Sequence, residues 1–468
     1  MAYVAYITTL KNVRPHSNAD RLQLGDCFGN TVCVNLDYYE GQVGVYFPTG
    51  GQLSVEFAEN NNLLRKKDGT GGYMDPDKRN VVAIRLRGEK SDGLFLPLSC
   101  LDYCYSDSDK KAEKVLKVGD TIDVVNGNEI CKKYVPARAA RSGRPTEGNK
   151  VRKKKMPYSP LFVEHADTEQ LAYNLNAFQP GDQIEITLKM HGTSQRTGYL
   201  PVFKGYKRTL LDKILRRPGE PQYEWDYVSG TRRTVLENFE GGFYDSNEFR
   251  KPHHDFFNGK LLKGETVYYE VVGFTTTGTP IMGNADNKKT KDKDFINKYG
   301  DTTVFSYGCE PEGKKTMYGN DEFGAFALET CAPQSDLYVY RMTMTNEDGD
   351  VVEYTPDFMR YRCEQMGAKT VPIFANCIIP HFTMLPDSVG SPQEIDAGQY
   401  VKDMAEKFYD GPDPIGKTHV REGVVVRIIN RPKFCAYKHK NFSFKLISGI
   451  VVEQTATDNL ADDILAEM

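Results

Sequence analysis

Lys189 is the residue of this chain best placed for covalent chemistry. It follows Gln183–Leu188, where polar and apolar residues alternate as in a β-strand, and it precedes the turn-forming run Gly192–Ser194. A lysine amine at a strand end, beside backbone and hydroxyl donors, can attack a phosphate group that those donors hold in line. The same Lys-x-x-Gly spacing occurs at Lys66 in a polar loop and at Lys90 in a predicted turn. We therefore predict that Lys189, rather than the other two lysines, is a nucleophile.

Two carboxylates and a group of lysines further along the chain could serve the same chemistry. Glu270 lies in an apolar strand, and Glu422, which we expect to face the surface, precedes a glycine and three valines. Lys438 and Lys440 are two positions apart, so a strand presents both on one face, and Lys445 follows nearby. Carboxylates hold hydrated Mg²⁺ or Mn²⁺, and lysines neutralise charge during phosphoryl transfer.

An arginine and an aromatic residue complete this group. Arg232 follows Gly230–Thr231, and Tyr340 lies in the predicted strand Leu337–Met342. An arginine can hold a phosphate, and an aromatic ring can stack on a base. Each of these residues also fits an ordinary structural role, Glu270 and Tyr340 as strand residues and the lysine pair as a solvated basic edge.

The order of these residues resembles the motifs of the covalent nucleotidyltransferases, the superfamily of DNA ligases, RNA ligases and mRNA capping enzymes. Lys189 with Gly192, Thr193 and Ser194 resembles motif I. The later motifs follow in the family's order: Glu270 resembles the motif III glutamate, Tyr340 the motif IIIa aromatic residue, Glu422 the motif IV glutamate, and Lys438 with Lys440 the motif V pair.

The first part of the chain resembles one branch of that superfamily. Residues 16–22, 45–48 and 86–94 are similar to the N-terminal oligonucleotide-binding (OB) module of the Deinococcus/Naegleria-type RNA ligases. The resemblance implies an ATP-dependent RNA ligase, active in RNA repair, that joins a 3′-hydroxyl to a 5′-phosphate at nicks in duplexes. The reaction would pass through a lysyl-AMP intermediate and an adenylylated 5′-phosphate.

The resemblance also implies a role for each motif residue. It assigns catalysis to Lys189, Glu422, Lys438 and Lys440, and attachment of Mg²⁺ or Mn²⁺ through water to Glu422. Glu270 would accept hydrogen bonds from the ribose, and Tyr340 would stack on the adenine. ATP, held as covalent AMP, would be bound by the four catalytic residues together with Gly192, Thr193, Arg232, Glu270, Tyr340 and Lys445, the last of which competes with the motif V pair.

Two alternatives stay open at this point. One is a capping-type guanylyltransferase, and the other is a non-catalytic OB-type RNA-binding protein with an inert transferase domain. DNA ligases and capping enzymes carry an OB domain after motif V, whereas only twenty residues follow Ser448 here, too few for a barrel. An inert protein would be expected to have lost Lys189 or Glu422, and both are present.

A phosphate-binding loop is suggested by Gly411–Thr418, which matches the pattern G-x-x-x-x-G-K-T. That motif requires a strand before it and a helix after it, because the helix amides bind the phosphates. Here a helical pattern precedes the match and a strand pattern follows it. Pro412 and Pro414 also lack the amide hydrogens that would bind phosphate. We predict an ordinary loop.

The strands and helices expected to position these residues indicate an α+β protein. Residues 1–131 consist of short strands separated by Gly-rich turns, which is typical of a small β-barrel of the OB type. Residues 158–468 predict a ligase-type adenylyltransferase domain of antiparallel sheets with flanking helices, two of them near 352–366 and 396–409. Stretches near 201–226, 281–300 and 310–335 look like insertions into this domain.

Residues 132–157 predict a basic linker between the two domains. Between Lys132 and Lys155 there are ten Lys or Arg residues and one Glu, a net charge of +9 in a protein whose overall net charge is −4. Such a segment is a solvated linker and also an electrostatic site for phosphates. We expect a nicked duplex of RNA or of RNA and DNA as the partner.

Composition excludes several classes of protein. Of the 468 residues, 39% are hydrophobic and 11% aromatic, so the chain can form real cores and is not wholly disordered. No apolar run approaches the length of a membrane span, and the N-terminus lacks the pattern of a signal peptide. The ten cysteines show no Cys-x-x-Cys pair, which favours free thiols. We therefore expect a cytoplasmic monomer without membrane contact.

Overall fold

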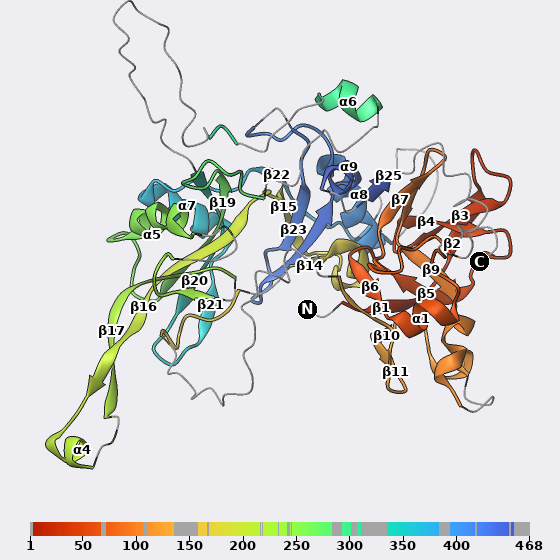
Figure 1. Cartoon of the computed structure of the whole chain (residues 1–468). Coiled ribbons are helices and arrows are strands. Elements are labelled where there is room, and N and C mark those ends of the chain that lie inside the picture. The colour runs from red at the N-terminus through yellow and green to blue at the C-terminus, as the bar shows by residue number, and fades with distance from the viewer. Residues whose placement is uncertain are drawn as a thin grey trace, which may run out of the picture. The chain divides into compact units, whose positions relative to one another are not determined.

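The computed structural model describes most of the chain and has the predicted α+β class. The described residues are 3–66, 72–106, 111–134, 158–165, 168–215, 217, 219–232, 234–240, 244, 246–282, 293–300, 307–309, 335–382, 394–416, 419–448 and 451–453. Strands dominate over helices in these ranges (Figure 1). The predicted linker 132–157 lies outside them, apart from 132–134.

The chain forms two compact units. The first consists of Met1–Gly143, Lys288–Ile296 and Lys445–Met468, and the second of Arg144–Asn287 and Asn297–Phe444. The C-terminal segment, which the sequence places in the second domain, thus groups with the first unit. The reason is a strand pairing: β25 (Val451–Glu453) runs parallel to β7 (Ala83–Leu86).

The first unit is built from small sheets of short strands. Its larger sheets have the orders β10 (Thr121–Ile122)–β1 (Ala5–Thr9)–β5 (Val43–Phe47)–β9 (Leu94–Pro97), β2 (Lys11–Pro15)–β3 (Leu22–Cys27)–β4 (Asn30–Asn35) and β25–β7–β8 (Glu89–Asp92). Two further pairs are β11 (Val124–Val125) with β12 (Asn128–Glu129) and β13 (Cys131–Lys133) with β6 (Gly51–Leu53). The strand pairs in the described ranges do not join into one closed barrel.

Apolar side chains on alternate strand positions form the core of this unit. Ile7 and Val45, which pair across β1 and β5, are fully buried there. The short helix α1 (Val55–Asn60) adds Phe57, whose ring lies 5.2 Å from that of Phe47. The helices η1 (Leu98–Cys104) and α2 (Ala112–Val115) complete the described helices of this part of the unit.

The second unit contains two sheets that lie on either side of the candidate site. The six-stranded antiparallel sheet has the order β18 (Val235–Leu236)–β17 (Glu220–Gly230)–β16 (Thr193–Lys207)–β19 (Glu265–Gly273)–β20 (Ser335–Thr345)–β21 (Val351–Glu353). The five-stranded sheet has the order β14 (Glu169–Gln170)–β24 (Cys435–Lys440)–β23 (Gly423–Ile428)–β15 (Gln183–Leu188)–β22 (Ile373–Ile378). Four predicted strands, now β15, β19, β20 and β23, are therefore confirmed.

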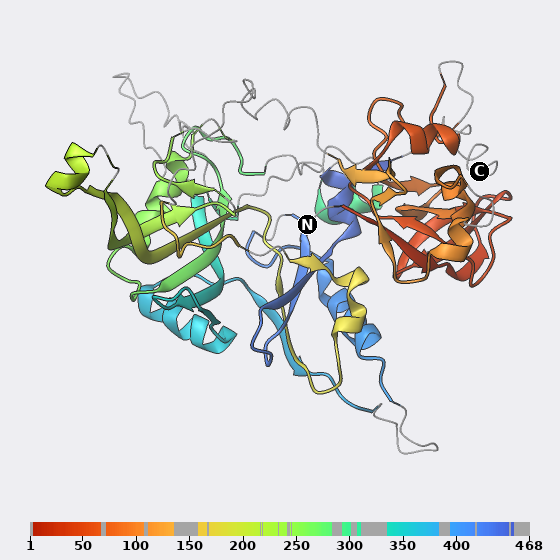
Figure 2. The same ribbon diagram turned by 90° about the horizontal axis from the view of Figure 1, so that it is seen from below.

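The region near 201–226, which looks like an insertion in the sequence, extends the six-stranded sheet. It forms the outer parts of β16 and β17 and carries α4 (Leu210–Ile214) at its end. This hairpin projects from the unit (Figures 1 and 2). The predicted insertion near 310–335 lies almost wholly outside the described residues.

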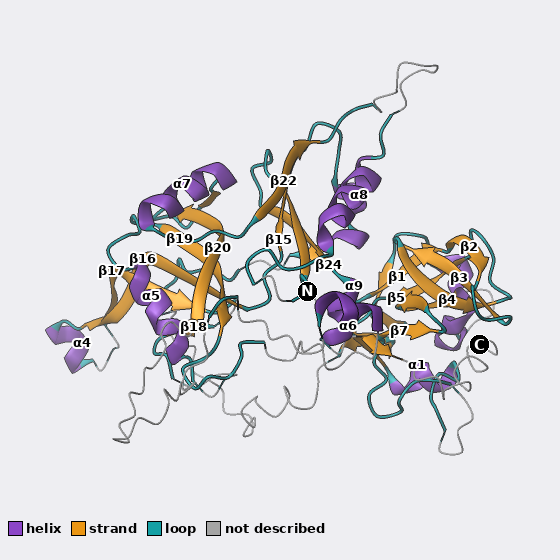
Figure 3. Ribbon diagram, turned by 90° about the horizontal axis from the view of Figure 1, so that it is seen from above, coloured by secondary structure: helices purple, strands orange, loops and turns teal. Residues whose placement is uncertain are grey.

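Two helices cover the sheets, as the sequence predicts (Figure 3). The helix α7 (Pro356–Met366) begins at Thr355, whose side chain accepts from Phe358 N, and its buried side chains pack with the core of the six-stranded sheet. The helix α8 (Ala397–Tyr409) begins at Asp396 and packs on the five-stranded sheet. Shorter helices are α5 (Lys251–Phe257), α6 (Lys293–Tyr299) and α9 (Phe442–Ile447).

Two whole-chain expectations can be compared with the described ranges. None of the helices there has both the length and the apolar character needed to cross a membrane. Nine of the ten cysteines are described, and all nine are free thiols.

Candidate active site

A pocket in the second unit lies between its two sheets. Residues of β15, β23 and β24 line one side, residues of β16, β19 and β20 the other, and α7 closes part of it. Lys189, Arg232, Glu270 and Tyr340 are among the lining residues. Four residues that the sequence singles out, from four separate stretches of the chain, therefore meet at one cavity.

Lys189 lies at the centre of a group of charged side chains. Its Nζ is 2.7 Å from Glu422 Oε1, and Lys440 Nζ is 2.9 Å from the same oxygen. The contact follows from strand pairing, because β15 and β24 lie on either side of β23. The Lys189 amide also donates to the Gly423 carbonyl at 3.0 Å, which extends the pairing one residue beyond β15.

Two glycines permit this close approach of backbones. Gly423 has φ +143°, and a Cβ there would lie 2.1 Å from the His439 carbonyl oxygen on β24. A Cβ at Gly192 would lie 2.4 Å from the Val271 carbonyl oxygen on β19. The turn after Lys189 can therefore pass against β19 only with glycine at that position.

Glu422 is buried, with 4% of its surface exposed. The expectation from the sequence that it faces the surface is therefore wrong. Burial alone would favour its neutral form. The ammonium groups of Lys189 and Lys440 and a hydrogen bond with His191 outweigh that effect and hold the Glu422 pKa well below its usual range. The carboxylate is therefore ionised in this site.

The pKa of Glu270 is shifted in the opposite direction, upward. It lies on β19 opposite Ser194 of β16 and borders the pocket. Burial raises its pKa to about 7, and the negative charge of Glu422 adds to the rise, while Lys189 and Arg232 oppose it. The two motif carboxylates thus differ in protonation near neutral pH because their surroundings differ.

Tyr340 and Thr193 are each fixed by a neighbouring side chain. The Tyr340 hydroxyl lies 3.1 Å from Ser194 Oγ, so its ring is held in the pocket wall. Arg250 Nη2 donates to Thr193 Oγ1 at 2.7 Å, and Arg250 Nη1 donates to the Ser194 carbonyl at 3.2 Å. The buried Arg250 is a supporting residue that the motif pattern does not reveal.

Arg232 reaches the pocket from the segment that joins β17 to β18. Its carbonyl oxygen accepts from Arg196 Nη1 at 2.5 Å and from the His165 amide at 3.1 Å. Arg196 is almost fully buried and stacks its guanidinium on Phe162 at 4.2 Å. The main chain at Arg232 is thereby held at the pocket edge.

Lys438 and Lys445 lie in different settings. Lys438 is on β24 opposite Val425, two residues from Ala436, and both Val425 and Ala436 line the pocket. Lys445 lies on α9 and forms an ion pair with Asp92 of β8, within the first unit. The structure gives Lys445 this partner and does not place it among the pocket residues.

His191 is a site residue that the sequence reasoning did not select. Its Nδ1 is 3.4 Å from Glu422 Oε2, and its Nε2 is 2.9 Å from the Met282 carbonyl, which can only accept. Its amide donates to the buried Tyr307 hydroxyl at 2.7 Å. The available signal was a titratable residue inside Lys-x-His-Gly, two positions after Lys189.

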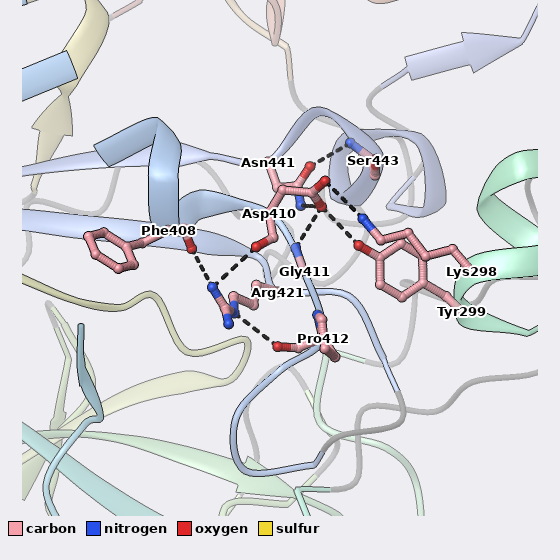
Figure 4. Close-up of polar contacts among 9 residues, drawn as sticks. All are labelled: Lys298, Tyr299, Phe408, Asp410, Gly411, Pro412, Arg421, Asn441 and Ser443. Atoms are coloured by element: carbon pink, nitrogen blue, oxygen red, sulfur yellow. Dashed lines mark hydrogen bonds and ion pairs between the residues drawn. The ribbon is translucent and has the colours of Figure 1, made fainter. Parts of the chain in front are cut away.

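The residues that flank Glu422 and Lys440 are both tied to the end of α8 (Figure 4). Arg421, just before Glu422, donates to the carbonyl oxygens of Asp410 at 3.1 Å and Pro412 at 2.9 Å. Asn441 donates from Nδ2 to Asp410 Oδ1 at 2.8 Å and from its amide to the Glu422 carbonyl at 2.9 Å. Asp410 is thus a common anchor for the strand ends that carry the two charged residues.

Residues of the predicted 281–300 insertion reach the same anchor. Tyr299 donates its hydroxyl to Asp410 Oδ1 at 2.9 Å, and Lys298 Nζ lies 3.3 Å from Asp410 Oδ2 (Figure 4). The loop that resembles a phosphate-binding motif starts here, between α8 and β23. A helix precedes it and a strand follows it, so the prediction of an ordinary loop is confirmed; Lys417 and Thr418 lie outside the described residues.

The donor set suits a hard divalent cation held mainly by water and phosphate. Among the described residues, no group of three or more His, Cys, Asp or Glu side chains forms a metal cluster. Glu422 supplies one ionised carboxylate beside Lys189. Mg²⁺ commonly binds proteins through one or two carboxylates and completes its shell with waters and substrate phosphates. The residues present therefore fit such an ion.

Comparison of the sequence with protein-family models and with curated proteins gives no match. The structure, in contrast, is similar to solved structures of an RNA ligase from Naegleria gruberi. A variant with ATP and Mn is 15% identical, with a TM-score of 0.51 over 96% of this chain and 98% of that chain. A second structure, with PPi, is 14% identical, with a TM-score of 0.51 over 94% and 97%.

A third structure, a variant with AMP and Mn, gives a TM-score of 0.51 at 14% identity over 94% of this chain and 97% of that chain. At such identity the likeness establishes the fold, and it extends over both units. The resemblance suggested by the motif order is confirmed at that level: over nearly its whole length, this chain has the fold of the Naegleria gruberi RNA ligase structures.

Proposed function

We propose that this protein is an ATP-dependent RNA ligase that joins 3′-hydroxyl and 5′-phosphate ends, with nicks in RNA or RNA/DNA duplexes as substrates. One observation carries the proposal. Lys189 meets Glu422 and Lys440, which come from a distant part of the sequence, through contacts shorter than 3 Å beside a pocket that also contains Glu270 and Tyr340. The similar Naegleria structures with ATP, AMP and PPi support a nucleotide ligand.

The proposed chemistry has three balanced steps. The Lys189 amine attacks the α-phosphorus of ATP, so an N–P bond forms, the bond to the β-phosphate oxygen breaks, pyrophosphate leaves and the amine loses a proton. An oxygen of the nick's 5′-phosphate then attacks the phosphorus of the lysyl-AMP, so a P–O–P bond forms, the N–P bond breaks and the Lys189 amine regains a proton. Finally the 3′-hydroxyl attacks the phosphorus of the adenylylated 5′-phosphate and loses its proton, so the phosphodiester bond forms, the P–O–P bond breaks and AMP leaves.

The charged and aromatic residues in and beside the pocket have separate parts in this proposal. Lys438 and Lys440 neutralise the α-phosphate charge, and Glu422 holds Mg²⁺ or Mn²⁺ through water. Glu270 accepts from the ribose, and Tyr340 stacks on the adenine. Arg232 holds a phosphate of the nucleotide or of the acceptor strand.

The N-terminal unit and the basic linker are proposed to bind the nucleic acid. The OB-type motif resemblance and the +9 segment between Lys132 and Lys155 support this role. We propose a protein that acts as a monomer on its duplex.

Covalent labelling tests the proposal directly. Incubation with α-labelled ATP and Mg²⁺ or Mn²⁺, followed by denaturing electrophoresis, should give a labelled chain, and α-labelled GTP should label it far less. Lys189→Ala should abolish the label because it removes the attacking amine. Lys66→Ala and Lys90→Ala serve as matched controls and should label normally, since neither lysine lines the pocket. A labelled Lys189→Ala chain would refute the nucleophile assignment, and a preference for GTP would favour a capping-type enzyme.

A further inference from the structure

The projecting hairpin of β16 and β17 carries aromatic side chains that the proposed chemistry does not use (Figure 1). Alternate positions of a strand point to the same face, and cross-strand pairs share a face. One face of the hairpin therefore carries six rings, those of Tyr199, Phe203, Tyr206, Tyr223, Trp225 and Tyr227. None of these six residues lines the pocket. We call this surface the aromatic face.

Contacts between neighbouring rings hold the aromatic face in a fixed arrangement. At its inner end Tyr199 stacks on Tyr227 at 4.7 Å, and both pack against the core of the six-stranded sheet. At its outer end the Phe203 ring lies 5.1 Å from that of Tyr206 and 5.8 Å from that of Tyr223. An isolated pair of strands is only marginally stable in water, and cross-strand aromatic pairs stabilise it. The outer rings are thus in place before a ligand binds, which lowers the entropy cost of binding.

The opposite face of the hairpin is covered near its base. Leu200 and Val202 are buried there and belong to a small core that includes Phe162. On the aromatic face, in contrast, Tyr206 is 43% exposed and Trp225 is half-buried. The aromatic face therefore keeps apolar surface that a ligand can cover.

The acidic residues of the hairpin lie away from the aromatic face or are occupied. Glu220, Glu224 and Asp226 alternate with the aromatic positions of β17, so they lie on the opposite face. Asp226 pairs there with Lys204. In α4, the Asp212 carboxylate accepts from the backbone amide three residues earlier at 2.9 Å. The aromatic face thus offers little repulsion to an anion.

Basic residues stand at both ends of the aromatic face. At the inner end, the exposed Lys263 places its Nζ 5.5 Å from the centroid of the Trp225 ring. At the outer end, the exposed Lys207 and Arg208 directly follow Tyr206. Proteins that bind single-stranded nucleic acids combine aromatic side chains, on which bases stack, with basic groups along the backbone of the strand.

We propose that the aromatic face binds an unpaired stretch of RNA, with bases stacked on the outer rings and phosphates near Lys207, Arg208 and Lys263. Successive cross-strand pairs on one face are roughly 6–7 Å apart along a strand, a spacing that an extended nucleic-acid strand can match. Stacking tolerates any base, because every base has a π face. The inference adds unpaired RNA to the duplex of the proposed function, and it rests on that function only in that the strand belongs to the substrate.

Trp225 gives a direct readout, because it is the only tryptophan of the chain and lies next to the outer rings. Its emission would be followed on the full chain, without ATP, in three titrations. The ligands are a short oligouridylate, the same strand paired with an oligoadenylate, and vesicles that contain phosphatidylserine. We expect saturable quenching by the single strand and little change with the duplex or the vesicles.

Replacing Phe203, Tyr206 and Tyr223 by leucine removes the rings but keeps an apolar surface. Because stacking contributes strongly for each base, this triple variant should bind the oligouridylate at least about tenfold more weakly. The matched control carries Phe358→Leu and Tyr361→Leu. These two exposed residues stack at 6.2 Å on α7 in the same unit, and their replacement should leave the titration unchanged. If the triple variant does not fold, Tyr206→Leu alone should weaken binding about fivefold.

Lys207→Gln combined with Arg208→Gln tests the phosphate contacts while leaving the rings intact. Each phosphate contact with a single strand contributes about 0.7 to the slope of log affinity against log salt. The slope of the oligouridylate titration should therefore become shallower by up to about 1.4. An unchanged slope would remove the assigned phosphate contacts from the inference.

The outcomes separate this inference from the proposed function. No quenching by the single strand, or equal affinity in the parent and the triple variant, would overturn the inference. Equal or stronger quenching by the duplex would assign the face to paired nucleic acid, and quenching by vesicles alone would assign it to a membrane surface; both results overturn the inference. A parent that fails to label itself with AMP would refute the ligase chemistry, and the Trp225 titration would still decide this point.

Discussion

Glu422 is the residue on which the charges of the site converge. Two ammonium groups and an imidazole surround one buried carboxylate. The carboxylate stays ionised because these neighbours are present. Glu270 lies close to the same lysine, and burial raises its pKa to about 7. Two glutamates in one pocket can therefore act differently, one as a fixed charge and the other as a group whose charge depends on pH.

The raised pKa of Glu270 predicts a dependence of stability on pH. The folded state holds this proton up to about pH 7, whereas the unfolded chain releases it near the ordinary value of 4.5. The free energy of unfolding therefore falls as the pH rises from about 4.5 to 7. Above about pH 7 the loss is complete and amounts to a value on the order of 1–3 kcal/mol. Glu270→Gln should match the parent near pH 5 and have a higher Tm than the parent at pH 8, without nucleotide.

Glu248→Gln is the control for that experiment, because Glu248 is an exposed glutamate of the same unit. Thermal unfolding of the three chains at both pH values is the measurement. A Tm difference between Glu270→Gln and the parent that is equal at pH 5 and pH 8 would contradict the prediction.

At the scale of elements, the end of α8 holds the strand ends that carry Glu422 and Lys440. Asp410 receives hydrogen bonds from Asn441 and Tyr299, and Arg421 binds the carbonyl oxygens around it. These contacts fix the start of β23 and the end of β24 relative to one helix. Asp410 itself does not line the pocket. We therefore treat it as a positioning residue.

Asp410→Ala should lower kcat for self-adenylylation about tenfold while changing the KM for ATP little. The reason is that small displacements of catalytic groups slow a reaction strongly, while the pocket wall that we propose to bind the nucleotide stays intact. Asp410→Asn, which keeps an acceptor for Asn441, should recover most of the rate. Lys298→Ala, which removes an exposed ion pair with Asp410 and a contact with the Tyr299 ring but leaves the Asn441 and Arg421 contacts in place, is the control and should resemble the parent. A KM effect as large as the kcat effect would argue for a general loss of structure.

The sequence was sufficient for those elements whose signals are local. Alternation predicts β15, an apolar run predicts β19, and helical patterns predict α7 and α8, so Lys189 and Glu270 could be placed on strand positions in advance. The sequence could not exclude Lys445 as an alternative to Lys438 and Lys440. Its ion pair with Asp92 depends on the position of α9, which no local pattern reveals. Arg250 carries no motif, since only the packing of the folded chain brings it to β16.

At the scale of the whole molecule, charge is unevenly distributed. The chain carries a net charge of −4, yet the segment from Lys132 to Lys155 carries +9. The pairing of β25 with β7 also means that the N-terminal unit is built from both ends of the sequence. A role in binding nucleic acid is therefore best tested on the intact chain and not by cutting it between domains.

Replacing the four basic residues Arg152–Lys155 by glutamine should weaken binding to a nicked duplex and leave self-adenylylation unchanged. Each phosphate contact contributes about 0.9 to the slope of log affinity against log salt on duplex DNA, so the slope should become shallower by up to about 3.6. Binding measured at several salt concentrations is the test. Glutamine at Lys114 and Lys117, outside the linker, provides a control. An unchanged slope would show that the linker does not contact phosphates.

Because β25 pairs with β7, the first unit contains a strand that is synthesised late. A ribosome makes β7 early and β25 only after the whole second unit. Until then the edge of β7 that β25 covers has no partner from its own sheet, and an exposed strand edge can pair with another nascent chain. Domains generally begin to fold from the N-terminus during translation. The first unit is therefore the first to be made and among the last to be completed, and chains released before β25 should aggregate more readily than full-length ones.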